Sequence, residues 1–272
     1  MVYVPGTSGN DAGLTALYGY DNSSDLIYGF AGHDDLYGLS GNDFLNGGAG
    51  NDYMYGGSGN DTYEIGGSGS GGAGGLTGGW DKFIEYDDEG DDRILILPTA
   101  GWAWTAIQIS GFGPTPGIDE IEIIENNTTG PGYVYVRGTV DFEDVTQWIN
   151  MNEIRGTANA DTIKGSNVDD PDIYGNGGND IIDGRAGEND LYGGAGKDTF
   201  VVSTDGDHST IHDFDIDADE EIQFTSDIAD DISDLSISDV SGDALITVGT
   251  VAITVAGVDH NLLTSGDYFA FV

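Results

Sequence analysis

The sequence predicts an all-β chain that winds as a β-solenoid, and three observations point to this fold class. A motif of nine residues, with a glycine-rich first half and one large apolar residue near its end, repeats in two blocks. Outside the blocks, short apolar runs are separated by Gly and Pro, as strands are by turns. Stretches with the period of a helix are scarce.

The first block contains four nonamers in register, at 29–37, 38–46, 47–55 and 56–64. Position six is always an aspartate, namely Asp34, Asp43, Asp52 and Asp61. Position eight is always large and apolar, namely Leu36, Leu45, Met54 and Tyr63. Two irregular copies lie upstream: 6–11 ends on Asp11, and Asp25 fits the ten-residue unit 19–28 after one insertion.

The second block extends from 156 to 201 and is less regular. Its units 156–164, 175–183 and 193–201 hold Asp161, Asp180 and Asp198 at position six. Two other units depart from the pattern. In 184–192, Asn189 takes position six and Asp190 follows it, and in the ten-residue unit 165–174, Asp172 comes one step late.

Each nonamer predicts a six-residue turn followed by a three-residue strand, in which only position eight faces inward because side chains alternate. Glycine at positions one, two and four permits positive φ and a close approach of backbones. Two nonamers then form one coil of 18 residues, with their strands on opposite sheets. Leu36 is expected to stack on Met54, and Leu45 on Tyr63, with turns of one edge about 4.8 Å apart.

This spacing brings Asp34 next to Asp52, and Asp43 next to Asp61. Two carboxylates at such a distance repel each other unless they are protonated or bridged by a cation. The surrounding turn carbonyls make the site all oxygen. Calcium accepts about six to eight oxygen ligands in an adaptable geometry, whereas magnesium requires a tighter octahedron. The pattern therefore favours calcium.

These repeats resemble the RTX family, the repeats-in-toxin or haemolysin-type proteins with the nonapeptide pattern G-G-x-G-x-D-x-U-x. The resemblance implies a parallel β-roll with several Ca²⁺ ions held between adjacent turns by carboxylates and turn carbonyls. It assigns the ligand role to these residues: Asp11, Asp25, Asp34, Asp43, Asp52, Asp61, Asp161, Asp172, Asp180, Asp190 and Asp198. Sites that use the turns at 165–174 and 184–192 are expected to be distorted.

The overall composition limits the partners. There are 7 Lys+Arg against 49 Asp+Glu, for a formal net charge of −42. Such a chain repels nucleic acid and anionic membrane surfaces, so we expect neither as a partner. There is no cysteine for a disulfide or a thiolate metal site. The first residues show no Sec-type signal, and no run is long enough for a transmembrane segment.

The patterns divide the chain into five parts. We expect a first β-roll block at 1–65, a Gly-rich linker or loop at 66–79, a β-rich segment with all four tryptophans at 80–155, a second block at 156–202 and a β cap at 203–272. Short strands are expected at 93–97, 106–109, 121–124 and 133–136, and a hairpin at 244–248 and 251–255.

The C-terminal residues extend the resemblance. Residues 210–224 look like the acidic connector after the last RTX repeats, and 267–272 (DYFAFV) resembles a type I secretion tail, in which an acidic residue precedes terminal hydrophobic residues. The resemblance implies a bacterial protein that an ABC exporter delivers to the cell surface or the medium. An ordinary final edge strand is the alternative for 267–272, and the two interpretations are compatible.

Other groups of residues have competing interpretations. The pairs Tyr37/Tyr55 and Tyr174/Tyr192 are stacked ladders or ligand-binding stripes, and Trp102 and Trp104 are core residues or a glycan platform. His208 and His212 lack the neighbouring Glu of a zincin, so surface positions are expected rather than zinc. The alternating acidic run at 213–219 lacks the Gly and Glu of an EF-hand, which leaves a solvated loop or a supplementary calcium site.

Together these observations predict a secreted calcium-binding protein whose folding is triggered by extracellular calcium. We find no catalytic motif and expect no enzyme activity in this chain. A structural, adhesive or assembly role is the first interpretation, with self-association along exposed strand edges. The alternative is the secretion and folding module of a larger enzyme, such as a protease, lipase or polysaccharide-modifying enzyme.

Overall fold

The computed structural model describes residues 2–7, 9, 11, 17–19, 23–65, 82–84, 92–96, 105–110, 120–123, 132–143, 145–149, 151–264 and 267–272. The chain forms two compact units. Unit 1 comprises Met1–Tyr135 and Asp144–Asn152, and unit 2 comprises Val136–Glu143 and Glu153–Val272. Among the described residues, helix is confined to α1 (His260–Leu263) and the 3-10 helix η2 (Ile232–Asp234).

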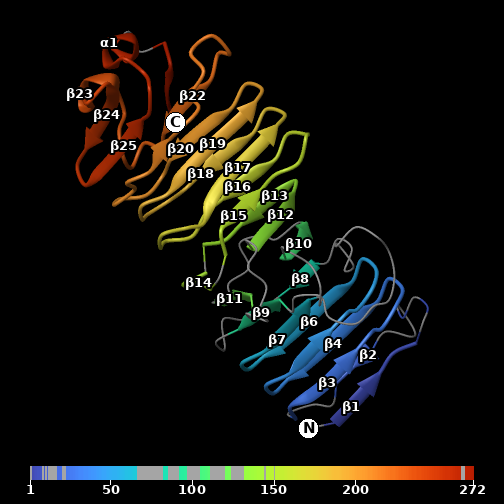
Figure 1. Ribbon diagram of the computed structural model, residues 1–272. Coiled ribbons are helices and arrows are strands. Elements are labelled where there is room, and N and C mark those ends of the chain that lie inside the picture. Colours follow the sequence, from blue (N-terminus) through green and yellow to red (C-terminus); the bar gives the residue numbers. More distant parts are fainter. Residues whose placement is uncertain are drawn as a thin grey trace. The chain divides into compact units, whose positions relative to one another are not determined.

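Unit 1 is built from parallel strands in two sheets (Figure 1). The first sheet has the order β1-β3-β5-β7-β9-β11-β14, and the second has the order β2-β4-β6-β8. The strands of unit 1 are β1 (Val2–Pro5), β2 (Leu17–Tyr18), β3 (Asp25–Tyr28), β4 (Asp35–Ser40), β5 (Phe44–Asn46), β6 (Tyr53–Ser58), β7 (Thr62–Ile65), β8 (Lys82–Ile84), β9 (Arg93–Ile96), β10 (Thr105–Ser110), β11 (Glu120–Ile123) and β14 (Gln147–Ile149). Strand β12 (Gly132–Arg137) crosses the division between the units.

From β1 to β9, successive strands along the chain alternate between these two sheets, whereas β10 belongs to the same sheet as β12. The register pairs Leu36 with Met54 in one sheet and Leu45 with Tyr63 in the other, so one coil contains two nonamers, as the repeat predicts. All four of these side chains are buried. The parallel β-solenoid expected from the sequence is therefore confirmed.

Unit 2 repeats the architecture. One sheet has the order β13-β16-β18-β20-β22-β26, and the strands β15-β17-β19-β21-β25-β24-β23 follow one another in the other. The strands are β13 (Thr139–Asp141), β15 (Glu153–Arg155), β16 (Thr162–Lys164), β17 (Asp172–Gly177), β18 (Ile181–Asp183), β19 (Asp190–Ala195), β20 (Thr199–Val202), β21 (Thr210–Ile211), β22 (Glu221–Phe224), β23 (Ser236–Val240), β24 (Asp243–Val248), β25 (Val251–Val255) and β26 (Phe269–Phe271). Position eight again supplies the core, with Ile163, Ile173, Ile182, Leu191 and Phe200 buried between the sheets.

The end of unit 2 departs from parallel pairing. Strand β21 pairs in parallel with β25, and β25 then pairs antiparallel with β24, which confirms the expected hairpin. Strand β24 pairs antiparallel with β23, so the sheet ends in an antiparallel edge. On the other sheet, β26 pairs in parallel with β22, so residues 269–271 form a closing strand. The edge-strand interpretation of 267–272 is confirmed, and a secretion signal there stays a prediction.

The four strands expected between 93 and 136 are all present, as β9, β10, β11 and β12. In this segment, β8 pairs with β6, and β9 pairs with β7, so the solenoid of unit 1 continues beyond the first repeat block. The five-part division of the chain stays a prediction. The linker 66–79 and the side chains of Trp80, Trp102 and Trp104 lie outside the described residues.

Candidate metal centre

The turns that join the two sheets place the repeat aspartates in columns along the edges of the solenoid. In unit 1 the backbone N–H of Asp34 donates to Oδ1 of Asp52 at 2.9 Å, and that of Asp43 donates to Oδ1 of Asp61 at 2.7 Å. These are the pairs that the repeat length predicts. We name each such column of turns an aspartate edge.

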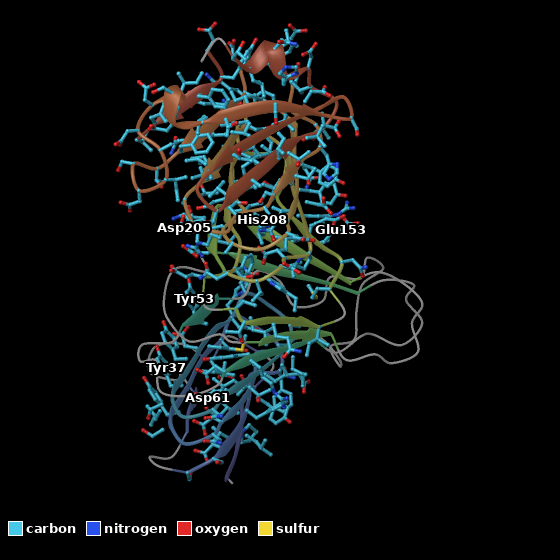
Figure 2. All side chains as sticks on the ribbon, turned by 90° about the vertical axis from the view of Figure 1, so that its left-hand side faces the viewer. Tyr37, Tyr53, Asp61, Glu153, Asp205 and His208 are labelled. Atoms are coloured by element: carbon cyan, nitrogen blue, oxygen red, sulfur yellow. The ribbon has the colours of Figure 1, made fainter. Side chains whose placement is uncertain are left out.

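Unit 1 has two aspartate edges. One contains Asp11, Asp34 and Asp52, linked by bonds of 2.6 and 2.9 Å. The other contains Asp25, Asp43, Asp61 and Asp92, linked by bonds of 2.8, 2.7 and 2.6 Å. Figure 2 shows Asp61 among the side chains of unit 1, with Tyr37 and Tyr53 projecting outward from the ribbon.

In unit 2, one edge has the same arrangement. The N–H of Gly138 donates to Oδ1 of Asp161 at 2.6 Å, that of Asp161 to Asp180 at 2.8 Å, and that of Asp180 to Asp198 at 2.8 Å. The turns 156–161, 175–180 and 193–198 form this aspartate edge. The opposite edge of unit 2 has a different composition and is considered separately below.

The second carboxylate oxygen distinguishes these aspartates from ordinary turn residues. Oδ2 is buried and has no hydrogen-bond partner in six of them: Asp34, Asp43, Asp52, Asp61, Asp180 and Asp198. A buried carboxylate oxygen without a partner is costly, because its hydration is lost and not replaced. The columns therefore present oxygen ligands that the protein itself leaves uncompensated.

Glycine at position one brings a carbonyl oxygen to the same place. A Cβ on Gly29 would lie 2.7 Å from Oδ2 of Asp34 and 2.5 Å from the carbonyl oxygen of Gly47 in the next coil. At Gly193, a Cβ would lie 2.6 Å from Oδ2 of Asp198. Only glycine leaves room for this convergence of carboxylate and carbonyl oxygens. Such a set of hard oxygen donors suits calcium.

Burial raises the pKa of these carboxyl groups. The pKa of Asp43 rises to about 6, and the pKa values of Asp52, Asp61 and Asp180 rise to about 7, because burial removes water from the charged form. The neighbouring aspartate in the column adds repulsion, and the hydrogen bond from its backbone N–H partly offsets the rise. A bound cation would reverse this balance.

A cation at these edges would depend on backbone oxygens as well as carboxylates. In the part of the chain that the structure describes, no three His, Asp or Glu side chains gather in a group able to hold a metal ion. The columns bring carboxylates together in pairs, and the turn carbonyls complete the donor set. The all-oxygen ligand set expected from the sequence stays a prediction.

Position two of the repeat separates two kinds of turn. In turns with an uncompensated Oδ2, this residue has a left-handed backbone, as at Leu39 (φ 81°) and Asn176 (φ 71°). Where it is threonine, its N–H turns toward the carboxylate instead: Thr7 donates to Oδ2 of Asp11 at 2.7 Å, and Thr157 donates to Asp161 at 2.7 Å. The threonine hydroxyls add further bonds to the same carboxylates. Asp11 and Asp161 are thus already compensated.

Two of the expected ligands lie outside the columns. Asp172 and Asp190 begin strands β17 and β19, and they do not lie in the turns. The place of position six in unit 165–174 belongs to Asp170, which accepts hydrogen bonds from the N–H and the hydroxyl of Ser166. The inserted Pro171 is the reason, because it adds its residue after position six rather than before it.

Asp92 and Glu220 are two of the buried acidic residues that the repeat pattern alone missed. Asp92 lies at the end of an aspartate edge and is 1% exposed, and Glu220 precedes β22 and is 2% exposed. Burial raises the pKa of Glu220 to about 7. Both residues stand two positions before a buried isoleucine, Ile94 or Ile222, as position six does in each repeat. An acidic residue two positions before a buried apolar residue is therefore found even where the preceding turn lacks the glycine pattern of the repeat.

The outward tyrosines form stacked ladders, as one of the two interpretations predicts. The ring centroids of Tyr37 and Tyr55 are 4.4 Å apart, and those of Tyr174 and Tyr192 are 4.3 Å apart. Tyr18 extends the first ladder at 4.8 Å, and His212 extends the second at 4.6 Å. These stacked pairs support the sheets from outside.

The histidines and the acidic run take part in separate contacts. His212 Nε2 lies 2.6 Å from Oδ1 of Asp190, whereas His208 Nε2 lies 2.9 Å from the carbonyl oxygen of Thr250. In the run 213–219, Asp213 accepts hydrogen bonds from the backbone N–H groups of Gly193 and Gly194. Asp213 thus caps the last repeat turn. A supplementary calcium site in this run stays a prediction.

Comparison with known proteins agrees with this geometry. The family of the RTX calcium-binding nonapeptide repeat (4 copies) matches residues 24–63 and 172–201. No curated protein matches the chain. The solved structure of the extracellular lipase LipA from Serratia marcescens has 17% sequence identity and a TM-score of 0.30, over 85% of this chain and 40% of the lipase chain.

The chain thus spans less than half the length of that lipase, and a similarity this low says nothing about the activity of this chain. No helix among the described residues has the length and apolar character that crossing a membrane requires. The family model matches the two stretches in which the regular repeats and their buried aspartates lie. The chain carries Ca²⁺-binding nonapeptide repeats of the RTX family.

Proposed function

We propose that this is a secreted protein whose repeat units fold when calcium binds along the aspartate edges. The observation that carries the proposal is the set of six buried Oδ2 atoms without a partner. These atoms are the proposed primary ligands, in Asp34, Asp43, Asp52, Asp61, Asp180 and Asp198, together with turn carbonyl oxygens of the adjacent coil. Asp25 is a further ligand in the second column of unit 1.

The roles of the remaining expected ligands differ. Threonine donates to Asp11 and Asp161, which begin two of the three columns, so these two aspartates contribute less to calcium affinity. Asp172 and Asp190 lie in strands and belong to no proposed site. We thus propose different roles for aspartates that the repeat pattern treats alike.

Charge and glycine content explain why folding would depend on calcium. Without a cation, the columns oppose coil stacking through carboxylate desolvation and repulsion, and the glycine-rich turns lose much conformational entropy on folding. When bound, calcium neutralises the carboxylates and links neighbouring turns. Binding free energy then contributes directly to folding.

The free energy that calcium binding would add is comparable in size with the stability of a small domain. A site whose Kd is about ten-fold below the free calcium concentration adds about 1.4 kcal/mol to stability. Three such sites, one for each of the pairs Asp34/Asp52, Asp43/Asp61 and Asp180/Asp198, would add about 4 kcal/mol, which is close to the lower end of the total stability of about 5–15 kcal/mol of an ordinary domain. Weak sites with Kd of about 10⁻⁴–10⁻³ M, typical of extracellular modules, would fill at about millimolar calcium.

The proposed cellular role depends on the higher calcium concentration outside the cell. The chain would stay unfolded during export by a type I exporter and fold at the cell surface or in the medium. There it would act as a structural, adhesive or assembly-forming protein. Binding of glycans by Trp102 and Trp104 belongs to the same proposal. Whether the repeats also serve a larger enzyme depends on the length of the native reading frame.

Calcium titration of the chelated chain tests the proposal. We expect the far-UV circular dichroism signal of β structure to appear with calcium, while the hydrodynamic radius falls. Magnesium at the same concentration is the control, and it should produce little of either change because its octahedral demand fits the turns poorly. A spectrum and radius that are the same in chelator and in calcium would refute calcium-dependent folding.

A further inference from the structure

The second edge of unit 2 is built without an aspartate column. It contains the turns 165–170, 184–189 and 203–209, and we name it the arginine edge. In its central turn, position two is Arg185 and position six is Asn189. The equivalent turn of the aspartate edge, 175–180, has Asn176 and Asp180 at these positions. The two edges therefore have the same turn conformation but different side chains at positions two and six.

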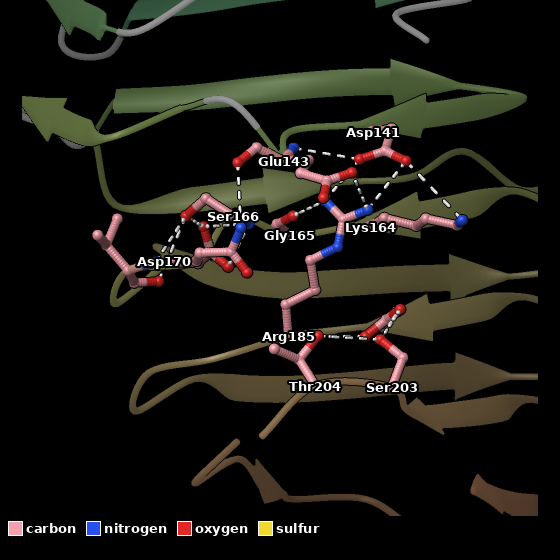
Figure 3. Close-up of polar contacts among 12 residues, drawn as sticks. Asp141, Glu143, Lys164, Gly165, Ser166, Asp170, Arg185, Ser203 and Thr204 are labelled. Carbon is pink, nitrogen blue, oxygen red and sulfur yellow. Dashed lines mark hydrogen bonds and ion pairs between the residues drawn. The ribbon is translucent and has the colours of Figure 1, made fainter. Parts of the chain in front are cut away.

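The guanidinium of Arg185 lies inside this edge (Figure 3). Its Nη1 and Nη2 are 2.6 and 3.0 Å from the two carboxylate oxygens of Asp141, and Nη1 also donates to the carbonyl oxygen of Gly165 at 2.8 Å. Nη2 donates to Glu143 at 3.3 Å. The side chain of Arg185 is only 8% exposed, and that of Asp141 only 4%. One cation thus joins three successive coils.

The backbone of Arg185 keeps the repeat conformation. Its φ of 57° is left-handed, as at Asn176 with 71°. The two side chains also share one contact, because the amide of Asn176 donates to the carbonyl oxygen of Gly156 just as Arg185 donates to that of Gly165. The longer Arg185 then reaches one coil further, to Asp141. Arg185 therefore keeps the bond to the glycine carbonyl oxygen that Asn176 also makes, and adds the contact with Asp141.

At position six, Asn189 places an N–H donor where the regular repeat has a carboxylate oxygen. Its Oδ1 accepts the N–H of Asp170 at 2.9 Å, which preserves the hydrogen bond of the columns. Its Nδ2 donates to the carbonyl oxygen of Gly184 at 2.8 Å. A Cβ on Gly184 would meet this amide nitrogen and the Ser209 hydroxyl, whereas the other position-one glycines face a carboxylate oxygen. Turn carbonyls that would ligate calcium are occupied here by N–H donors.

The acidic residues Asp170 and Asp207 of the two flanking turns also have hydrogen-bond partners. Asp170 is saturated by Ser166, and Ser209 donates its hydroxyl to Asp207 at 2.5 Å. Neither Asp170 nor Asp207 has the buried oxygen without a partner that marks the aspartate edges. Asp170, Asp207 and the carbonyl oxygens of Gly165 and Gly184 on this edge therefore have hydrogen-bond donors from the chain itself.

We propose that Arg185 and Asn189 replace calcium on the arginine edge, so that this edge of unit 2 forms its native contacts without the metal. The guanidinium supplies the positive charge, and its planar donors satisfy one carboxylate in bidentate fashion and a turn carbonyl. A second cation beside it would be repelled. The inference rests on the proposed calcium sites of the aspartate edges, which provide its reference.

The test converts the turn 184–189 into a copy of 175–180. The double variant R185N/N189D restores a left-handed Asn at position two, which Asn176 shows to be tolerated, and an Asp at position six. Calorimetric titration of the full chain should then show one calcium ion more per chain than the wild type, and the chelated variant should lose β signal. D180N is the matched control and should bind one ion fewer than the wild type.

Hydrogen exchange of the wild type gives a second readout that does not require a variant to fold. In chelator, the amide of Asp170 should exchange about ten-fold more slowly than those of Asp34 and Asp43, which lie on aspartate edges. Equal exchange at all three, or a double variant with unchanged calcium stoichiometry, overturns the inference. A wild type that binds no calcium at all would instead overturn the proposed function, so the two failures are distinguishable.

Discussion

Units 1 and 2 both stack acidic turns, but they differ in how many of their buried carboxylates have partners within the chain. Unit 1 carries aspartate columns on both edges, and four of its carboxylates have a buried Oδ2 without a partner. Unit 2 carries one such column, and its other edge is held by Arg185 and Asn189. The backbone register is parallel in both units. Coil geometry and calcium demand are thus separate properties of the sequence.

The comparison teaches where the calcium requirement resides. Glycine at position one and the apolar residue at position eight recur in both units and produce the coil. The residues at positions two and six differ between turns: threonine donates to the carboxylate in some, Arg185 and Asn189 take these positions in one, and in the others we propose that a cation compensates it. We therefore expect unit 1 to depend on calcium more strongly than unit 2.

The largest effect should come from a glycine shared by both units. A Cβ on Gly50 would overlap the carbonyl oxygen of Gly32 in the preceding coil, and one on Gly196 would overlap that of Gly178. Both glycines also have positive φ, 144° and 149°. Replacing either with alanine should cost more than about 4 kcal/mol in calcium, measured by denaturant unfolding.

A matched control separates overlap from backbone strain. Gly206 has a φ of 84° but open space around its missing Cβ, so Gly206→Ala should cost only about 1–2 kcal/mol. If Gly50→Ala were as mild as Gly206→Ala, the coils would not be in the close contact described here.

Removing one carboxylate should have opposite effects with and without calcium. In Asp52→Asn and Asp180→Asn, the amide oxygen can still accept the backbone N–H, while the buried charge is gone. In calcium, each variant should lose a site and about 1–2 kcal/mol of stability. In chelator at pH 7.5, each should be more stable than the wild type, because a carboxylate with raised pKa no longer has to ionise.

Chemical denaturation in both media measures this reversal of sign. Asp11→Asn is the control, because Thr7 already compensates its carboxylate. Equal destabilisation of Asp52→Asn in both media would show that this carboxylate acts in the fold through hydrogen bonding alone.

The pH response should distinguish the two units. The folded pKa values of Asp52 and Asp61 are about 7, above the ordinary 3.8, so their contribution to stability is full below about pH 4 and is lost as the pH rises through 7. The chelated chain should therefore regain β structure as the pH falls from 7.5 to 5. Bound calcium should abolish this dependence in unit 1.

In unit 2, part of the pH dependence should persist in calcium. Burial raises the pKa of Asp207 to about 7, and this residue lies on the arginine edge. Hydrogen exchange at pH 6 and 7.5 in saturating calcium should show a change near Asp207 that Asp207→Asn removes. An invariant pattern there would imply that the arginine edge also binds calcium.

The smallest effect should come from the aromatic ladders. Tyr37 stacks between Tyr18 and Tyr55, and Tyr192 stacks between Tyr174 and His212. Replacing the central ring with alanine should cost about 1 kcal/mol in either unit, measured as a shift in the denaturation midpoint. Tyr53→Ala, whose side chain is 46% exposed, should change the midpoint less than either.

The repeat pattern predicted the coil well because its causes are local. Alternation about position eight and glycine at position one place Leu36 on Met54 and align Asp34 with Asp52, and the structure has both. The same spacing misplaced the aspartates of irregular units. The sequence predicted Asp172 as the ligand of unit 165–174. Because Pro171 is inserted after position six, the aspartate that lies in the turn is Asp170.

Compensation by distant residues could not be predicted from the repeat. Arg185 finds Asp141 across two coils, and that pairing depends on the register of strands separated by 44 residues. Asp92 and Glu220 retain only the acid-x-apolar signal, which is too short to stand out in an acidic chain. The sequence indicated that the turn 184–189 was irregular, and the structure provides the physical reason.

The antiparallel hairpin at the end of unit 2 limits how this architecture can propagate. A parallel coil offers its successor an identical hydrogen-bonding ladder, which is also the template for fibrous growth. Because β24 and β23 reverse direction next to β25, the outermost strand no longer presents that template in the same orientation. The reversal therefore removes, on this sheet, the parallel ladder on which a further coil of the same kind would stack.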